Sequence, residues 1–219
     1  MLRARSERFD PDAVTYRCKI AGLVLAGGAG RRMGGANKAL SMLGGKPLIA
    51  YAIERLAPQV AALAISANRD VDRLAVFDCP ILADHDPRLL GPLAGILAGL
   101  RWAAGRGYTH LATAAADTPF LPANLVDRLA TAGSDSQAVA LAVSGGRVHP
   151  VFGLWPVALG DALSAHLAES EDRSVIAFAR AQGISEVEFA IDGDRDPFFN
   201  VNTQDDLDRA HRMMGDAAR

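Results

Sequence analysis

The chain has 219 residues, half of them hydrophobic, and a formal net charge of −2 at pH 7. This length fits one α/β domain with a full core. The small negative charge excludes a general attraction to nucleic acid or anionic lipid, and no apolar run approaches the roughly 20 residues of a membrane span. We therefore expect a soluble protein without nucleic-acid or membrane partners, in which any anion site is built from local charges.

The beginning of the chain differs in character from the rest. Residues 1–17 mix both charge signs and include a proline, so we expect a mobile extension ahead of a single domain over residues 18–219. The extension contains acids, which argues against a transit peptide, and it lacks the apolar segment of a signal peptide. The two cysteines, Cys18 and Cys79, match no metal-ligand spacing. A cytoplasmic location is the simplest interpretation.

The segment over residues 20–40 places an apolar run directly before glycines and basic side chains. Residues 20–25 are typical of a strand buried on both faces of a parallel sheet. The glycines that follow can take positive φ and present N–H groups to an oxygen-rich ligand. Arg31 and Arg32 suit forked contacts to phosphate oxygens, and Lys38 supplies a compact point charge. The segment therefore predicts a nucleotide-phosphate site.

Two familiar phosphate loops do not fit this segment. Lys38 stands between Asn37 and Ala39, which excludes G-x-x-x-x-G-K-[ST], and no acid lies at the ribose distance after a G-x-G-x-x-G. A tight glycine turn of an ordinary α/β protein is the plain alternative. The ordered set instead resembles the pattern L-A-G-G-x-x-x-R-M-G-G-x-x-K of nucleotidyltransferases, and closely that of the molybdenum cofactor guanylyltransferases (MobA family). The matching residues are Leu25, Ala26, Gly27, Gly28, Arg32, Met33, Gly34, Gly35 and Lys38.

This resemblance implies roles for the loop. The backbone from Leu25 to Gly28 would bind GTP, with Arg32 and Lys38 acting on the triphosphate as catalytic residues. The family usually has an aspartate before the lysine, and this sequence has Asn37 there. The charge that could orient Lys38 is therefore absent, which bears on substrate tuning and not on the fold.

A helix and a second strand should follow the loop. Residues 46–48 predict the start of a helix that continues to about Leu56, with proline tolerated in its first turn. Residues 60–66 predict an apolar strand that ends close to Asn68. Ligands of open α/β sheets gather outside the carboxyl ends of the strands, although an asparagine there is by itself more typical of a turn or cap. The A-N-R motif at residues 67–69 resembles that of the family, which implies that Asn68 binds the guanosine end of GTP.

Asp84 follows a third expected strand, over residues 79–83. A carboxylate acceptor matches the N–H donors of guanine, and the resemblance implies that this strand-terminal aspartate contacts the nucleotide. The histidine and aspartate after Asp84 read as loop residues rather than as a catalytic dyad. A helix should begin with G-P-L-A-G at residues 91–95, whose glycines allow close approach. The resemblance places Gly95 against the bound nucleotide.

Asp117 follows the next expected strand, over residues 110–115. An aspartate before Thr-Pro would by itself be read as a helix cap or a turn. Together with the glycine loop, however, D-T-P-F-L-P at residues 117–122 matches the second signature of this transferase superfamily. A carboxylate beside a triphosphate is a usual ligand of Mg²⁺, which accepts one or two protein carboxylates and fills its shell with phosphate and water. We therefore predict Asp117 as the metal ligand and as a catalytic residue.

The second half of the chain should contain a hairpin with strands over residues 138–143 and 148–154, added to a parallel sheet. Arg147 and His149 lie on this hairpin. A strand histidine is more often structural, but the H-P dipeptide resembles one that the family has near its acceptor site, which implies acceptor binding. The other expected elements are helices over residues 125–130, 155–167 and 174–182 and a strand over residues 186–189.

The last informative run is F-F-N-V-N-T-Q-D-D-L from residue 198. Thr203 and Asp206 predict a capping box at a helix start. A cap does not explain Asn200 and Asn202, whose alternation predicts that both side chains share one face of a strand. The run matches the closing motif of the family, in which an asparagine completes the Mg²⁺ and phosphate shell. We group Asn200 and Asn202 with the acceptor-side residues.

Taken together, the motifs predict an α/β fold: a single-domain, Rossmann-like three-layer sandwich with a mostly parallel mixed sheet. The resemblance implies GMP transfer from GTP to molybdenum-molybdopterin, with Mg²⁺ as cofactor and pyrophosphate as product. It also implies molybdenum-insertion proteins and molybdoenzyme delivery chaperones as partners. The alternatives are a cytidylyltransferase for the same pterin or another small phosphate, and a nucleotide-binding regulatory domain without catalysis.

Overall fold

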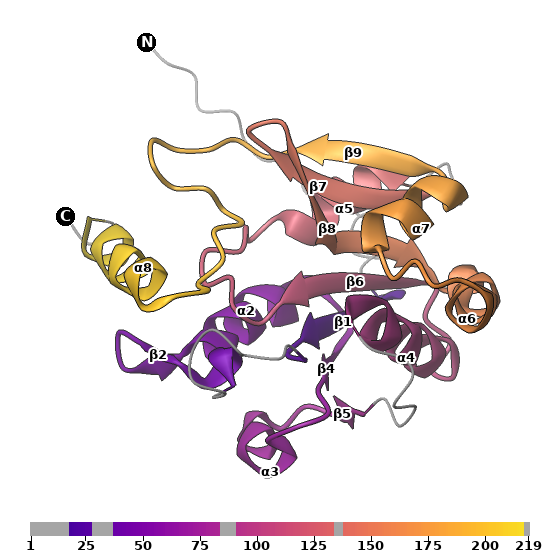
Figure 1. Cartoon of the computed structure of the whole chain (residues 1–219), viewed down its shortest axis with the longest axis horizontal. Helices are drawn as coiled ribbons and strands as arrows, with labels where there is room; N and C mark the ends of the chain where they lie inside the picture. The colour runs from indigo at the N-terminus through magenta and orange to yellow at the C-terminus, as the bar shows by residue number, and fades with distance from the viewer. Residues whose placement is uncertain (1–17, 28–36, 84–90, 134–137, 217–219) are drawn as a thin grey trace.

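The computed structural model describes residues 18–27, 37–83, 91–133 and 138–216. Its centre is a sheet of seven strands in the order β5-β4-β1-β6-β8-β7-β9 (Figure 1). Among these strands only β8 runs antiparallel to its neighbours. The predicted mostly parallel mixed sheet is thus confirmed. The strands are β1 (Ile20–Leu25), β4 (Ala62–Ser66), β5 (Ile81–Leu82), β6 (His110–Ala115), β7 (Val139–Ser144), β8 (Arg147–Pro156) and β9 (Ile184–Glu188).

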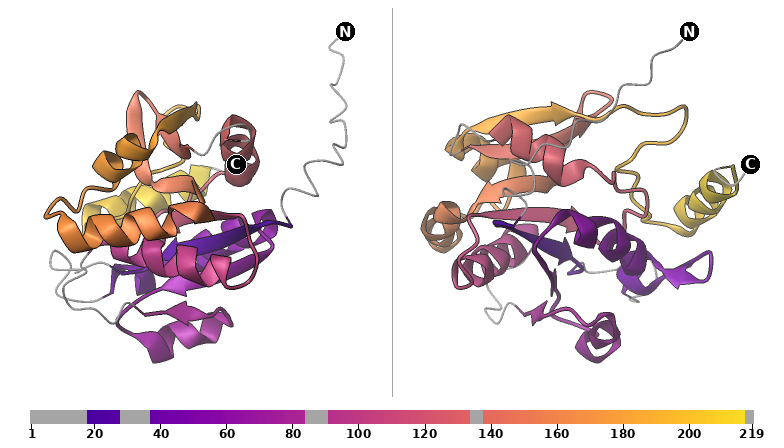
Figure 2. Two further views of the ribbon diagram at one scale, coloured as in Figure 1. Left: turned by 90° about the vertical axis from the view of Figure 1, so that its right-hand side faces the viewer. Right: turned by 180° about the vertical axis from the view of Figure 1, so that it is seen from behind.

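Helices cover both faces of the sheet (Figures 1 and 2). One face is covered by α2 (Leu48–Leu56) and α5 (Leu125–Gly133), and the other by α4 (Pro92–Ala104), α6 (Gly160–Glu169) and α7 (Val175–Gln182). This arrangement confirms the predicted three-layer sandwich. No helix among the described residues is long and apolar enough to cross a membrane.

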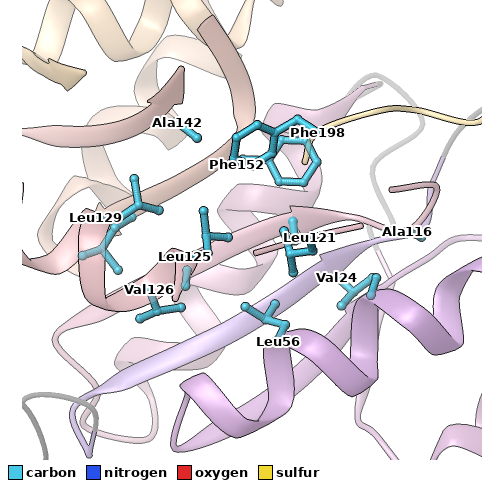
Figure 3. Packing of buried hydrophobic residues seen from close by; sticks show 14 of the residues in the cluster. Val24, Leu56, Ala116, Leu121, Leu125, Val126, Leu129, Ala142, Phe152 and Phe198 are labelled. Carbon is cyan, nitrogen blue, oxygen red and sulfur yellow. The ribbon is translucent and has the colours of Figure 1, made fainter. Parts of the chain in front are cut away.

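The pattern of side chains along β1 shows why its sequence is almost continuously apolar. Ile20 and Val24 pack into the core under α2 and α5, whereas Ala21 and Leu23 pack into the core under α4. All four side chains are fully buried. Figure 3 shows the first of these cores, in which aromatic and branched side chains fill the space between the sheet and its helices. A strand buried on both faces needs no polar alternation.

A small satellite core lies beside the main sheet. Helix α8 (Gln204–Asp216) packs there on a short hairpin formed by β2 (Met42–Leu43) and β3 (Lys46–Pro47), with Leu43 and Val201 fully buried. The remaining described elements are single turns: η2 (Lys38–Leu40), η3 (Ala57–Gln59), α3 (Val71–Leu74), η4 (Ala75–Phe77) and η5 (Val157–Leu159).

The structure corrects three predicted elements. Residues 46–47 form β3 rather than the first turn of α2, because the backbone of Pro47 is extended, at φ −68° and ψ 148°. Trp155 and Pro156 are the last two residues of β8 rather than the start of a helix: Trp155 pairs with Leu111, and its Nε1 donates a hydrogen bond of 3.0 Å to the buried Thr113 hydroxyl. Residues 200–202 belong to a loop and not to a strand.

The register of the sheet brings several strand ends to one edge. Leu25, at the end of β1, pairs with Ser66 of β4 on one side and with Ala115 of β6 on the other. The residues after these strands therefore lie side by side, at the carboxyl edge where open α/β sheets bind their ligands. Because β8 is antiparallel, its first residue, Arg147, comes to the same edge.

Candidate active site

Lys38 and Asp117 form an ion pair at this edge. Lys38 is the first residue of η2, and Asp117 follows β6. The Nζ atom of Lys38 lies 2.6 Å from Oδ2 of Asp117, and the two side chains keep about one fifth of their surface exposed, 21% and 19%. Nζ also donates a hydrogen bond of 2.6 Å to Oδ1 of Asn202. Three residues predicted from three separate motifs therefore meet at one point that solvent can reach.

The substitution at Asn37 does not leave Lys38 without an orienting partner. Asn37 caps η2, since its Oδ1 accepts a hydrogen bond of 3.1 Å from the backbone N–H of Ala39. The ionic contact expected from a neighbouring aspartate is instead supplied by Asp117. The sequence alone could not show this because Asp117 lies far along the chain.

The loop that carries Asn200 and Asn202 is fastened directly to the strand end of β6. The fully buried Thr118 donates a short hydrogen bond from its hydroxyl to Oδ1 of Asn200. The backbone N–H of Val201 donates to the carbonyl oxygen of Asp117 at 3.0 Å. Although residues 200–202 form no strand, both asparagine side chains reach the cluster. Thr118 was missed in the sequence, where its place after Asp117 was the only signal.

The predicted capping box at Thr203 is confirmed. Its hydroxyl accepts a hydrogen bond of 3.1 Å from the N–H of Asp206, and Oδ2 of Asp206 accepts from the N–H groups of Asn202 and Thr203 at 2.9 Å. Desolvation raises the pKa of Asp206, but these hydrogen bonds outweigh it, so that its pKa is lowered. The ionised carboxylate thus holds the backbone of Asn202 in place.

The predicted nucleotide-binding backbone continues the sheet. The N–H of Ala26 donates to the carbonyl of Ser66 at 2.9 Å, and the carbonyl of Leu25 accepts from the N–H of Ala116 at 3.1 Å. Gly27 is exposed just beyond them. Asn68 is likewise exposed, just after β4, on the same edge. The predictions for Gly28, Arg32 and Asp84 fall outside the described residues.

Gly95 has a packing role at this edge. A Cβ at this position of α4 would lie 2.5 Å from the Ser66 hydroxyl oxygen and 2.9 Å from a Leu25 methyl. The glycine therefore lets the first turn of α4 approach the ends of β1 and β4 closely. Any contribution of Gly95 to nucleotide binding stays a prediction, whereas its packing role is clear, since a larger residue would force Ser66 or Leu25 to shift.

Arg147 and His149 differ in their access to solvent. Arg147 is exposed at the start of β8, whereas the His149 side chain is 6% exposed. Its Nε2 lies 2.7 Å from the Ser144 hydroxyl oxygen, and its ring centroid is 4.7 Å from that of Phe198. Acceptor binding by both residues stays a prediction, but the burial of His149 favours an indirect role.

Gln59 and Arg55 hold the segment after Asp117, and no sequence pattern indicated either residue. The buried Gln59 amide donates to the carbonyl of Pro122 at 2.9 Å and accepts from the N–H of Val126 at 2.9 Å. Arg55 donates to the carbonyl of Leu121 at 3.0 Å. These contacts join η3 and α2 to a segment some sixty residues away, so that no local pattern could have indicated them.

A doubly covered, mostly parallel sheet with a lysine–aspartate pair and the exposed Gly27 at its carboxyl edge is the arrangement of an α/β nucleotidyltransferase. The family model of the MobA-like NTP transferase domain matches residues 22–185, and the chain belongs to this family. The resemblance identified from the motifs is thereby confirmed.

Relatives of known name cover nearly the whole chain. A protein of Cereibacter sphaeroides named molybdenum cofactor guanylyltransferase is 50% identical over 196 residues, which are 90% of this chain and 97% of that protein. A protein of the same name from Mesorhizobium japonicum is 48% identical over 202 residues, again with 90% and 97% coverage.

Solved structures of more distant proteins share the fold. Molybdopterin-guanine dinucleotide biosynthesis protein A from Archaeoglobus fulgidus superposes with a TM-score of 0.72 at 24% identity, over 90% of this chain and 99% of that one. A 4-diphosphocytidyl-2C-methyl-D-erythritol synthase from Anaerococcus prevotii gives a TM-score of 0.71 at 11% identity, over 94% and 100%. At these identities the likeness shows the fold alone.

Proposed function

We propose that this protein transfers GMP from GTP to molybdenum-molybdopterin and releases pyrophosphate, as a molybdenum cofactor guanylyltransferase. The observation that supports this most directly is the junction of Lys38, Asp117 and Asn202 at the carboxyl edge, beside the backbone of Leu25 to Gly27. The names of the relatives support the choice of substrates. A cation next to a carboxylate, with amide donors nearby, is the equipment that phosphate transfer requires.

The residues at this edge fit a Mg²⁺ ion that is shared with the nucleotide. Among the described residues no group of three His, Cys, Asp or Glu side chains forms a ready-made metal site. Mg²⁺ is commonly held by one or two protein carboxylates, with substrate phosphates and water completing its shell, so the single carboxylate of Asp117 is sufficient. When bound, the ion would neutralise charge on the phosphates. Asp117 would hold it, with the amide oxygen of Asn200 or Asn202 as a further oxygen ligand close by.

The reaction needs no nucleophile from the protein. A phosphate oxygen of molybdopterin attacks the α-phosphorus of GTP in line, an O–P bond forms, and the bond to the β-phosphate oxygen breaks as pyrophosphate leaves. The protein therefore acts by positioning the reactants and by stabilising charge. Lys38 donates hydrogen bonds to phosphate oxygens, and the exposed amide of Gly27 lies at the same edge for a second contact. The hydrogen bond to Asn202 holds the Lys38 ammonium at the edge where the phosphates would lie.

We assign recognition of the guanine base to the end of β4, which lies next to the end of β1. Asn68, exposed after β4, offers both a carbonyl acceptor and an amide donor for the guanosine end of GTP. Arg147, exposed at the start of β8, lies toward the other half of the edge, where the acceptor phosphate would arrive. The alternative of a cytidylyltransferase differs only at the base, because the phosphate chemistry is the same.

We further propose that the protein works in the cytoplasm, where insertion proteins supply the molybdenum-bearing pterin and delivery chaperones receive the product. Cys18 and Cys79 are both free thiols, as is usual in a reducing compartment. Co-purification of such partners with the full chain would test this assignment.

The test of the proposed function is a nucleotide comparison. Purified protein is incubated with molybdenum-molybdopterin, Mg²⁺ and either GTP, CTP or ATP, and pyrophosphate release is measured. We expect kcat/KM for GTP to exceed that for CTP by at least about tenfold, because unpaired polar groups on the wrong base cost roughly 1–3 kcal/mol each. Asn68→Ala should reduce this ratio, with Asn124→Ala, an exposed asparagine before α5, as the matched control. Equal values for GTP and CTP would exclude the guanine assignment, and the absence of turnover with any nucleotide would exclude the enzyme.

A further inference from the structure

A chain of three hydrogen-bonded polar side chains, two buried and one partly buried, lies in the half of the sheet that contains β7 and β8. The Ser144 hydroxyl donates a hydrogen bond of 2.8 Å to Oδ1 of Asp196. The hydroxyl oxygen of Ser144 also lies 2.7 Å from Nε2 of His149. A hydroxyl has one hydrogen and a carboxylate only accepts, so Nε2 of His149 must be the donor to Ser144. Ser144 and His149 are 2% and 6% exposed. At this level of burial the side chains of Ser144 and His149 are not available to a substrate, and the partly buried Asp196 accepts from Ser144.

This chain of hydrogen bonds ends on the loop that carries Asn200 and Asn202. Oδ1 of Asp196 accepts a second hydrogen bond, of 2.9 Å, from the N–H of Phe198, and the carbonyl of Asp196 accepts from the N–H of Phe199 at 3.0 Å. Asp196 thereby closes the turn from which residues 198–203 leave toward Asp117. No other described acid takes part in this turn.

Phe198 adds an aromatic anchor to the same turn. Its side chain is 2% exposed, and its ring lies 4.7 Å from His149 and 4.9 Å from Phe152, measured between centroids. Figure 3 shows Phe152 and Phe198 packed against each other at the end of the core. His149 therefore holds the turn in two ways. Its Nε2 donates to Ser144, which in turn donates to Asp196, and its ring packs against Phe198. Two residues beyond Phe198, Asn200 reaches Thr118, and Asn202 reaches Lys38.

We propose, on the basis of the GMP transfer proposed above, that Ser144, His149 and Asp196 are positioning residues that fix the 198–203 loop and so hold Asn202 against Lys38 and Asn200 against Thr118. Asn202 lies four residues beyond the anchored Phe198, and the stretch between them is tied to the sheet by the N–H of Val201, which donates to the carbonyl of Asp117. The opposite end of the loop is fixed by Asp206 at the start of α8. His149 acts on the reaction through this loop and does not contact the acceptor.

A kinetic cycle tests this role. Ser144→Ala should lower kcat for GMP transfer on the order of tenfold, because a small misplacement of a positioning group is costly. In an Asn202→Ala background the same substitution should cost less than about threefold, since the group that it positions is already absent. Asp196→Asn, which keeps an acceptor oxygen, should stay close to wild type, whereas Asp196→Ala should resemble Ser144→Ala.

Thr113→Val is the matched control. It removes a buried hydroxyl that accepts a 3.0 Å hydrogen bond from Trp155, in the same sheet but away from the loop. Its effect on kcat should be small and equal in both backgrounds. If Ser144→Ala costs the same factor with and without Asn202, or if Thr113→Val reproduces its pattern, the positioning role is overturned.

Hydrogen–deuterium exchange separates this proposal from the proposed function. In the full chain without substrates, Ser144→Ala should speed exchange in residues 198–203, which include the N–H of Val201 bonded to Asp117, and Thr113→Val should not. If wild type transfers no GMP, the proposed function fails and this measurement alone decides the positioning role. Unchanged exchange in Ser144→Ala would overturn the proposal whatever the kinetics.

Discussion

The two halves of the sheet bring residues to the active site in different ways. In the parallel half, β5-β4-β1-β6, the candidate site residues Asp117, Gly27 and Asn68 follow strands whose register aligns them. In the other half, β8-β7-β9, the site is reached by a loop that leaves after β9 and is fastened by buried polar and aromatic contacts. Backbone pairing aligns the first group, whereas the loop of the second group is held by side chains of distant elements.

The largest effect is expected at the parallel half. Asp117→Asn should lower kcat on the order of a thousandfold, because it removes the charge that pairs with Lys38 and that would hold Mg²⁺. The free energy of unfolding should change little, since Asp117 is partly exposed. Steady-state kinetics with chemical denaturation checks both. Asp161→Asn, an exposed acid of α6, is the control, and turnover near that of wild type at saturating Mg²⁺ would refute the assignment.

Lys38→Ala should have the next largest effect, on the order of a hundredfold in kcat, or about 2.7 kcal/mol. Charge accumulates on the phosphoryl oxygens and on departing pyrophosphate during the reaction, so the lysine should contribute more to the transition state than to GTP affinity. Steady-state kinetics and calorimetric titration of GTP separate the two quantities.

Lys46→Ala provides the matched lysine control, because Lys46 forms an exposed ion pair of 2.7 Å with Glu54 outside the site. Its kcat should stay near wild type. An unchanged kcat in Lys38→Ala would instead mean that Lys38 is a surface charge, and that the electrostatic role of the loop falls to Arg31 and Arg32.

Gln59→Leu should affect stability rather than catalysis. It leaves the buried N–H of Val126 and the carbonyl of Pro122 without their partner, which should lower the free energy of unfolding by about 2–3 kcal/mol. Because Asp117 is fixed by its own strand, kcat of the folded enzyme should change less than about twofold. Denaturant titration and kinetics decide, with Gln182→Leu at the end of α7 as control. A large loss of kcat without loss of stability would show that the parallel half also depends on distant side chains.

The smallest expected effect is a pH dependence of stability that arises in the half of the sheet formed by β8, β7 and β9. Burial lowers the pKa of His149, as does Arg147, while Asp196 and Glu188 oppose the shift. Below the ordinary histidine pKa of about 6.5, the unfolded chain therefore binds more protons than the folded one, and stability should fall as pH falls. The slope of Tm between about pH 6.5 and 5 should be shallower in His149→Phe.

His110 is the control for this slope. Burial lowers its pKa too, but it lies at the opposite end of β6 from the loop. His110→Asn should also flatten the slope without speeding exchange in residues 198–203. If His149→Phe leaves the slope as in wild type, His149 does not resist protonation in the folded state.

The sequence predicted every strand of the parallel half. The β1 and β6 boundaries agree with the structure at both ends, whereas β4 and β5 are shorter than the expected 60–66 and 79–83. Lys38 contacts both Asp117 and Asn202, which come from different motifs, and the roles of these residues stay predictions. These features follow from continuous apolar runs and from strand ends, both of which are local signals. The family resemblance supplied what the local signals could not, namely that the three motifs share one ligand.

Features that depend on long-range contacts were not predictable. The sequence predicts a helix from Trp155, but its indole N–H finds a buried partner only in the assembled sheet. The alternation of Asn200 and Asn202 suggested a strand, although the loop is shaped by Asp196 and Thr118, which lie outside that run. In both cases tertiary hydrogen bonds overrode the local pattern.

The two margins of the sheet also determine how copies of this protein can meet. At one margin β5 has only two residues, and at the other β9 carries the exposed Glu186 and Glu188. Short outer strands and outward charges both discourage the pairing of strands between molecules. The backbone groups along these margins are therefore poor templates for extending the sheet into a second chain. The protein can thus bury a strongly apolar core with little risk of aggregation through its edge strands.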